Sequence, residues 1–218
     1  MTGGTGQDGG HRLRTCLTIG HSTHGFDILA ALVKYHRASV IVDVRSTPYS
    51  RRAPQFNRES LQPALEHVGL KYVYMGDRLG ARYSNPDLLL VDGRVNLAAV
   101  ARLPGFQSAI GSLIDAIGGG NRIVLMCSEG DPFNCHRFVL VAHALQCQGI
   151  TVGHILADGS LVGSKPLEDQ LLTTYFPDSL EGNLFERSRP RNELVEIAYA
   201  RRAVDIAYRP GNPEEETM

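Results

Sequence analysis

A short polar segment, residues 127–137, holds the side chains of this sequence that are best suited to chemistry. It carries a thiol, a carboxylate, a second thiol, an imidazole and a guanidinium, from Cys127, Glu129, Cys135, His136 and Arg137. Apolar runs at residues 123–126 and 138–142 flank the segment, which predicts a strand before it and a helix after it. Open α/β sheets bind ligands at the carboxyl ends of their strands, so the segment predicts a functional site.

Cys127 directly follows the predicted strand. Backbone N–H groups and the dipole of the following helix would lower the pKa of a thiol at this position and favour a thiolate. Cys127 is therefore a candidate nucleophile or sulfur carrier. The alternative is an inert, half-buried cysteine, a common state of free thiols.

Glu129 is a candidate general acid or base, and its alternative is an ion pair with Arg137 or Arg45. Arg137, in the first turn of the predicted helix, would present a fork of N–H donors to a phosphate, sulfate or carboxylate. The alternative for Arg137 is an ion pair with Asp43. The segment adds three further candidate substrate-binding residues, Ser128, Cys135 and His136.

Two more polar loops follow predicted strands, at residues 20–25 and 43–52. If the strands are parallel, both loops lie at the same sheet edge as residues 127–137. His21 in the first loop is a candidate acid or base. Candidate substrate-binding residues from these two loops and the helix start that follows are Ser22, Asp43, Arg45, Arg51, Arg52, Phe56 and Asn57.

The basic side chains around Arg45, Arg51 and Arg52 form a local cationic region in a chain with a formal net charge of −1. Such a region suggests an anionic substrate or a nucleic-acid backbone, and its alternative is a solvated loop surface. We expect no metal, because no CxxC pair or HExxH helix accompanies the histidines and cysteines. The sequence requires no cofactor.

Apolar strand patterns alternate with helical patterns from residue 13 to about residue 160. This order predicts an α/β fold, a three-layer open and mainly parallel sheet with helices on both faces. We expect a C-terminal helical extension over residues 161–209, and disordered tails at residues 1–12 and 210–218. Asn57 is the expected N-cap of a helix that ends near Gly69.

Composition fits a water-soluble globular protein, with 43% hydrophobic and 21% charged residues among 218. No signal segment or membrane-spanning run is visible, so we expect a cytoplasmic protein without a membrane partner. In that compartment the four cysteines are expected to be reduced. Association into a homo-oligomer is left open.

The combination of motifs resembles the "domain of unknown function 488" family. The resemblance covers residues 13–159 and rests on five short motifs: 18–22 (TIGHS), 43–46 (DVRS), 54–57 (PQFN), 79–80 (LG) and 126–129 (MCSE) with 135–137 (CHR). It implies an α/β fold and a site, and no settled activity. A looser resemblance, through residues 41–45 and 124–130, is to rhodanese-type sulfurtransferases, although here the arginine lies ten residues beyond Cys127.

Three functional hypotheses follow. The first is an enzyme for a small anionic or nucleotide-like substrate, with Cys127 in sulfur or group transfer. The second is a hydrolase or glycosidase-like enzyme for a nucleotide or nucleic-acid base, in which Glu129 performs the chemistry. The third is a non-catalytic nucleic-acid-binding module that uses the arginine-rich loop of residues 45–58.

Overall fold

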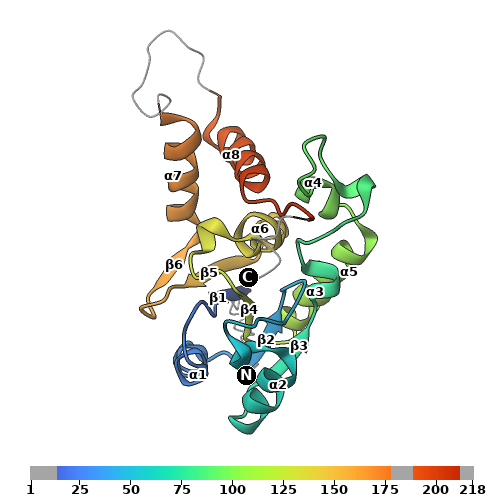
Figure 1. Cartoon of the computed structure of the whole chain (residues 1–218). Helices are drawn as coiled ribbons and strands as arrows, with labels where there is room; N and C mark the ends of the chain where they lie inside the picture. Colours follow the sequence, from blue (N-terminus) through green and yellow to red (C-terminus); the bar gives the residue numbers. More distant parts are fainter. Residues whose placement is uncertain (1–13, 178–188, 212–218) are drawn as a thin grey trace, which may run out of the picture.

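A six-stranded sheet forms the centre of the chain in a computed structural model that describes residues 14–177 and 189–211 (Figure 1). The strand order is β3-β2-β4-β1-β5-β6, and all neighbours are parallel except β5 and β6. The strands are β1 (Thr15–Gly20), β2 (Val40–Asp43), β3 (Lys71–Tyr74), β4 (Ile123–Cys127), β5 (Thr151–Ile155) and β6 (Leu161–Gly163).

Helices cover both faces of this sheet, which confirms the predicted three-layer architecture. The helices are α1 (Phe26–Tyr35), α2 (Arg58–His67), α3 (Gly76–Leu79), α4 (Leu97–Val100), α5 (Pro104–Gly118), α6 (His143–Cys147), α7 (Ser164–Tyr175) and α8 (Arg191–Asp205). The 3₁₀ turns are η1 (Pro54–Phe56), η2 (Pro86–Leu88) and η3 (Pro132–Asn134), and η4 (Arg137–Ala142) is a π-helix. None of the helices in the described ranges could cross a membrane.

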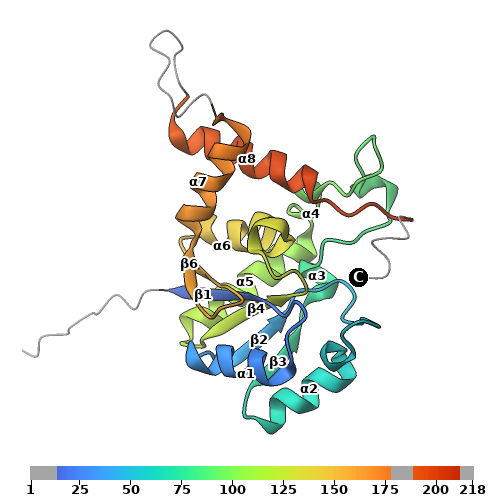
Figure 2. The same ribbon diagram turned by 60° about the vertical axis from the view of Figure 1, so that its left-hand side comes forward.

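Strand alternation divides the apolar side chains between two cores, because successive residues of a strand point to opposite faces. In β4, Ile123, Leu125 and Cys127 join the core beneath α5, η4, α7 and α8. Val124 and Met126 join the core beneath α1 and α2. Figure 2 shows α1 and α2 on one side of the sheet and α6 on the other. The alternation therefore points Cys127 toward the η4 and α6 side.

Two local predictions hold in position but not in detail. The helix predicted after the polar segment forms, but its first part, η4, is π-helical before α6 begins. A π-helix is uncommon, and its single turns often occur at functional sites, which periodicity alone does not reveal. Asn57 stands at the N-cap of α2 without capping it, because its Oδ1 accepts a 2.6 Å bond from the Ser50 N–H instead.

The sheet also continues past residue 160, where the C-terminal extension was expected to begin. β6 pairs with β5 through a short turn, and α7 starts immediately after it. Of the tails expected at residues 1–12 and 210–218, residues 1–12 and 212–218 lie outside the described residues, and residues 210 and 211 form part of a turn. α7 and α8 pack together beyond the sheet, as both views show (Figures 1 and 2).

Gly20, the last residue of β1, allows the chain to approach the 127–137 loop closely. A Cβ at Gly20 would lie 1.7 Å from the Glu129 carbonyl oxygen, far inside any real contact. The distance is to backbone, so relief requires a shift of the whole loop. A glycine is therefore required where β1 passes this loop.

We expect Gly20→Ala to lower the free energy of unfolding by about 3 kcal/mol, since overpacking against backbone cannot relax through a side-chain rotamer. Gly111→Ala is the matched control: a Cβ there meets nothing within 4 Å in the middle of α5. It should raise the free energy of unfolding by up to about 1 kcal/mol, because alanine favours a helix over glycine. Urea unfolding of both variants measures the two values, and equal stabilities would contradict the steric argument.

Candidate functional site

The three polar loops meet at the carboxyl edge of the parallel sheet, where β1, β2 and β4 end. Backbone bonds extend the ladder beyond the strands: His21 N–H donates to the Cys127 carbonyl at 2.9 Å, and Ser22 N–H to the Ser128 carbonyl at 2.9 Å. On the other side, Val44 N–H donates to the Met126 carbonyl at 3.0 Å. These main-chain bonds hold the loops in register with one another.

Asp43 and Arg45 form a buried ion pair with two parallel contacts. Arg45 Nε donates to Asp43 Oδ1 at 2.9 Å, and Arg45 Nη2 donates to Asp43 Oδ2 at 2.6 Å. Tyr72 of β3 donates to the same carboxylate at 2.7 Å, and Arg45 also donates to the Phe56 carbonyl at 2.8 Å. Arg45 was expected to bind substrate, but most of its donors already have protein partners.

His21 completes this polar cluster. Its Nδ1 lies 2.9 Å from the Ser22 carbonyl, an acceptor, so Nδ1 carries the proton. Its Nε2 then accepts from Arg45 Nη1 at 3.1 Å, and its ring stacks on Phe56 at 4.2 Å. Burial, together with the Arg45 charge, lowers the pKa of His21 to about 4. Neutral His21 is therefore placed to orient Arg45, with neither nitrogen available to a substrate.

A second cluster joins two thiols and an imidazole on the opposite face of the sheet. His136 Nδ1 lies 3.7 Å from Cys127 Sγ and 3.9 Å from Cys135 Sγ, and all three atoms lie within 4.8 Å of one another. His136 Nε2 lies 3.1 Å from the Val44 carbonyl, so it is the protonated nitrogen. Nδ1 therefore faces both thiols: it can take a proton from either one, and with that proton it stabilises the thiolate that remains.

Arg137 lies beside this cluster as a buried cation. It is 0% exposed, and its Nη atoms donate to the carbonyls of Glu129 and Gly130. Within the described ranges it forms no ion pair with a carboxylate, and the Asp43 partner considered from the sequence belongs to Arg45. A buried charge is costly without an opposite charge nearby. The surroundings of Arg137 therefore favour an anion.

The two cysteines respond in opposite directions. A hydrogen bond donated to Cys135, together with burial, raises the pKa of Cys127 well above its usual range. Burial alone would raise the pKa of Cys135 too. Three effects outweigh burial there and hold the pKa of Cys135 well below its usual range: the bond from Cys127, the Arg137 charge and the His136 imidazole. These opposite directions favour Cys135 as the thiolate of the pair, with Cys127 as its donor.

A pocket of about 380 Å³ opens onto both cysteines. Glu129 and Arg82 line it, and partial burial raises the pKa of Glu129. The Arg82 guanidinium lies 5.0 Å from the centre of the Tyr208 ring. The remaining lining residues are Arg45, Ser46, Thr47, Ala81, Cys127, Ser128, Asn134, Cys135, His136, Asp205, Ile206 and Ala207.

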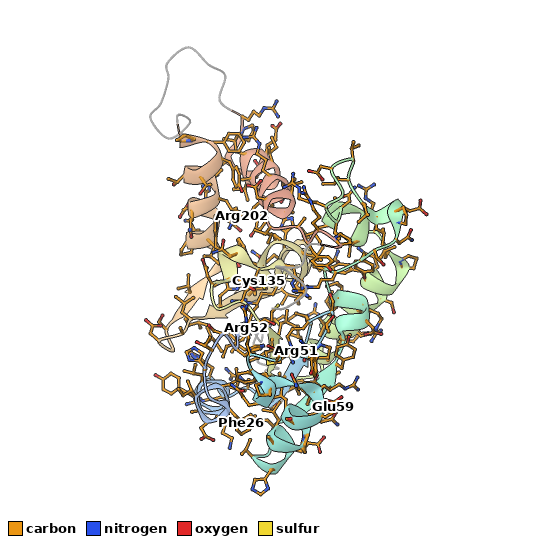
Figure 3. All side chains as sticks on the ribbon, in the orientation of Figure 1. Phe26, Arg51, Arg52, Glu59, Cys135 and Arg202 are labelled. Atoms are coloured by element: carbon orange, nitrogen blue, oxygen red, sulfur yellow. The ribbon has the colours of Figure 1, made fainter. Side chains whose placement is uncertain are left out.

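The C-terminal end of α8 forms a wall of this pocket, which the sequence did not predict. The Tyr208 carbonyl accepts from the Val95 N–H at 2.8 Å. Arg202 Nε donates to the Phe133 carbonyl at 3.1 Å, and the Arg202 guanidinium lies 4.3 Å from the centre of the Phe133 ring. Figure 3 labels Arg202 beside α8 and Cys135 nearer the middle of the molecule. No motif signals contacts between segments so distant in sequence.

Other predicted site residues lie elsewhere. Arg51 and Arg52 are exposed outside the pocket lining, and Ser22 and Phe56 are likewise absent from that lining. Phe56 is fully buried against His21 and is not available to stack on a base. In the arginine-rich loop that was proposed to bind nucleic acid, the Arg45 side chain is buried in its ion pair with Asp43 and does not face solvent.

The donors of Cys127, Cys135 and His136 are of types that zinc accepts. Their setting is less suited to a dication, because the buried Arg137 guanidinium and the Arg45 guanidinium both act on these thiols. The same positive charges stabilise a thiolate or a bound anion. The chemistry that this arrangement supports best is therefore nucleophilic attack by sulfur on an anionic compound.

A comparison with known protein families finds a match that includes the residues of this site. The searches of curated proteins and of solved structures returned no match, and the looser resemblance to rhodanese-type sulfurtransferases finds no support. The family model described as "Domain of unknown function DUF488" matches residues 27–144, more than half of the sequence and the part that contains β2, β4 and the thiol cluster. The chain belongs to the DUF488 family.

Proposed function

We propose that this chain is an enzyme that transfers a group from a small anionic substrate through the Cys135 thiolate. The observation that carries the proposal is Arg137, a fully buried guanidinium without a carboxylate partner in the described ranges, beside two thiols and an imidazole. From the sequence, Cys127 was the expected nucleophile. The opposite pKa shifts of the two thiols support Cys135 in that role, with Cys127 as its hydrogen-bond donor.

The proposed reaction has two displacement steps. In the first, the Cys135 thiolate attacks the electrophilic atom of the substrate, a sulfur–substrate bond forms, and the leaving group departs with the bonding electron pair. Glu129, protonated more readily because of its raised pKa, gives the leaving group a proton. In the second, an acceptor attacks the carried group, Glu129 takes its proton, and the thiolate is released.

Arg82 supports an anionic substrate. It reaches the pocket with no ion pair to a carboxylate in the described part of the chain, and it lies close enough to Glu129 to affect its charge. A guanidinium that lines a pocket without a carboxylate partner can bind the sulfonate, phosphate or carboxylate group of a substrate.

We place the reaction in the cytoplasm, since the proposed nucleophile must stay reduced and the four cysteines are free.

A second candidate function rests on the raised pKa of Glu129 at the pocket. In this alternative Glu129 activates water against a nucleotide or nucleic-acid base, and the thiols only hold the loop.

The thiolate assignment predicts two opposite pH dependences within one protein. Between pH 7 and 9, alkylation of Cys135 by iodoacetamide should change by less than about twofold, because its lowered pKa keeps it ionised throughout. In protein treated with a chelator, Cys147, whose pKa is raised by partial burial and by Glu196, should react roughly ten times faster for each pH unit. Peptide mass spectrometry at each pH gives both rates. A tenfold rise per unit for Cys135 as well would reject the thiolate.

The anionic-substrate assignment can be tested with two reagents that alkylate thiols by the same displacement of iodide and differ in charge. Iodoacetate should label Cys135 about tenfold more slowly in Arg82→Gln than in the wild type, because attraction of an anion into the pocket is lost. Neutral iodoacetamide should label both proteins at equal rates. Arg52→Gln, which removes an exposed arginine outside the pocket, is the control and should change neither rate.

The two candidate functions separate in a pair of variants. Group transfer predicts that Cys135→Ser forms no covalent adduct with an anionic electrophile, while Glu129→Gln still forms the adduct but both forms and releases it more slowly than the wild type. The hydrolase alternative predicts nucleoside or nucleotide hydrolysis that survives Cys135→Ser and stops in Glu129→Gln. Intact-mass measurement and product analysis on the same samples decide between them.

A further inference from the structure

A second cluster of metal-binding side chains lies on the surface, away from the pocket. His143 and Cys147 stand one turn apart on α6, and Glu196 faces them from α8. His143 Nε2 lies 3.2 Å from Glu196 Oε2 and 4.0 Å from Cys147 Sγ, and all three atoms lie within 4.8 Å of one another. One imidazole nitrogen, one thiol and one carboxylate thus converge from two helices.

These separations approach those of a tetrahedral zinc site. Zinc binds nitrogen and oxygen at about 2.0 Å and sulfur at about 2.3 Å, which puts N and O about 3.3 Å apart and N and S about 3.6 Å apart. The observed 3.2 Å and 4.0 Å differ from these by a few tenths of an ångström. Small side-chain rotations would close the difference without movement of either helix.

The orientation and charge of the donors also suit a cation. The His143 ring stacks on Tyr199 at 4.0 Å, which holds its Nε2 toward the other two donors. Glu196 is 62% exposed and is not paired with a lysine or arginine within the described ranges. Cys147 is exposed as well, so an ion could reach the site from solvent. Glu168, which accepts from Gln146 of α6, adds a further negative charge on this side of the helix.

We propose that His143, Cys147 and Glu196 form a zinc site that links α6 to α8, with the fourth position left to water or an external ligand. The site is independent of the proposed group-transfer reaction, because it shares no residue with the pocket. It would still influence that pocket mechanically, since α8 ends at Asp205 and the chain then forms the pocket wall through Tyr208. Bound zinc would hold this wall against the core.

Equilibrium dialysis of the full chain against zinc chloride, followed by elemental analysis, tests the site. We expect the wild type to bind one equivalent, and Cys147→Ser and Glu196→Gln each to lose at least about tenfold in affinity. The double variant Cys127→Ser with Cys135→Ser removes the buried thiols and should keep wild-type affinity. With cobalt in place of zinc, the wild type and this double variant should show a sulfur-to-metal charge-transfer band that Cys147→Ser lacks.

Three results would overturn the proposal. Cys147→Ser could bind zinc as tightly as the wild type, the wild type could bind no zinc, or the double variant could lose the zinc, which would place the metal at Cys127 and Cys135. Thermal unfolding gives a second readout. Zinc should raise the melting temperature of the wild type by several degrees and leave that of Glu196→Gln unchanged. An equal rise in both proteins would also count against the site.

Discussion

The ion pair between Asp43 and Arg45 fixes the edge of the sheet on which the candidate site is built. Its members are almost fully buried, and its further partners come from β3, from the loop after β1 and from η1. Removing one partner of such a pair typically costs about 3–5 kcal/mol, since the other charge is left buried and alone. The pair therefore determines where the β2 loop runs, and with it the position of the Val44 carbonyl that orients His136.

Arg45 and Arg137 at this edge of the sheet affect the site differently, because only Arg45 forms an ion pair with a carboxylate in the described residues. Arg45 is neutralised by Asp43, whereas Arg137 donates to neutral carbonyls and keeps an uncompensated charge. The nearby ionisable groups that can compensate it are the two thiols and the Glu129 carboxyl, and Cys135 has Cys127 as a hydrogen-bond donor. The charge on Arg137 and the direction of that hydrogen bond together favour Cys135 as the thiolate.

The sequence was sufficient for the features that depend on local pattern. Apolar strands between amphipathic helices predicted the parallel sheet, and parallel strands implied that the loops after β1, β2 and β4 converge. Features set by competition between partners were not predictable. Nothing local shows that Arg45 is occupied by Asp43, that Asn57 bonds to Ser50 instead of capping α2, or that the chain after α8 returns to wall the pocket. Each depends on which of several possible partners the folded chain places within hydrogen-bond distance.

Similar residue types occur in two clusters of this chain, and charge distinguishes their chemistry. Cys135 and His136 lie beside a buried guanidinium, where a negative sulfur is stabilised and a dication is opposed. Cys147 and His143 lie beside the exposed Glu196 carboxylate, where the balance is reversed. A thiol and an imidazole at similar separations thus favour a nucleophile in one place and a metal ligand in the other. The cationic or anionic neighbour, more than the cysteine–histidine pair itself, decides between these two outcomes.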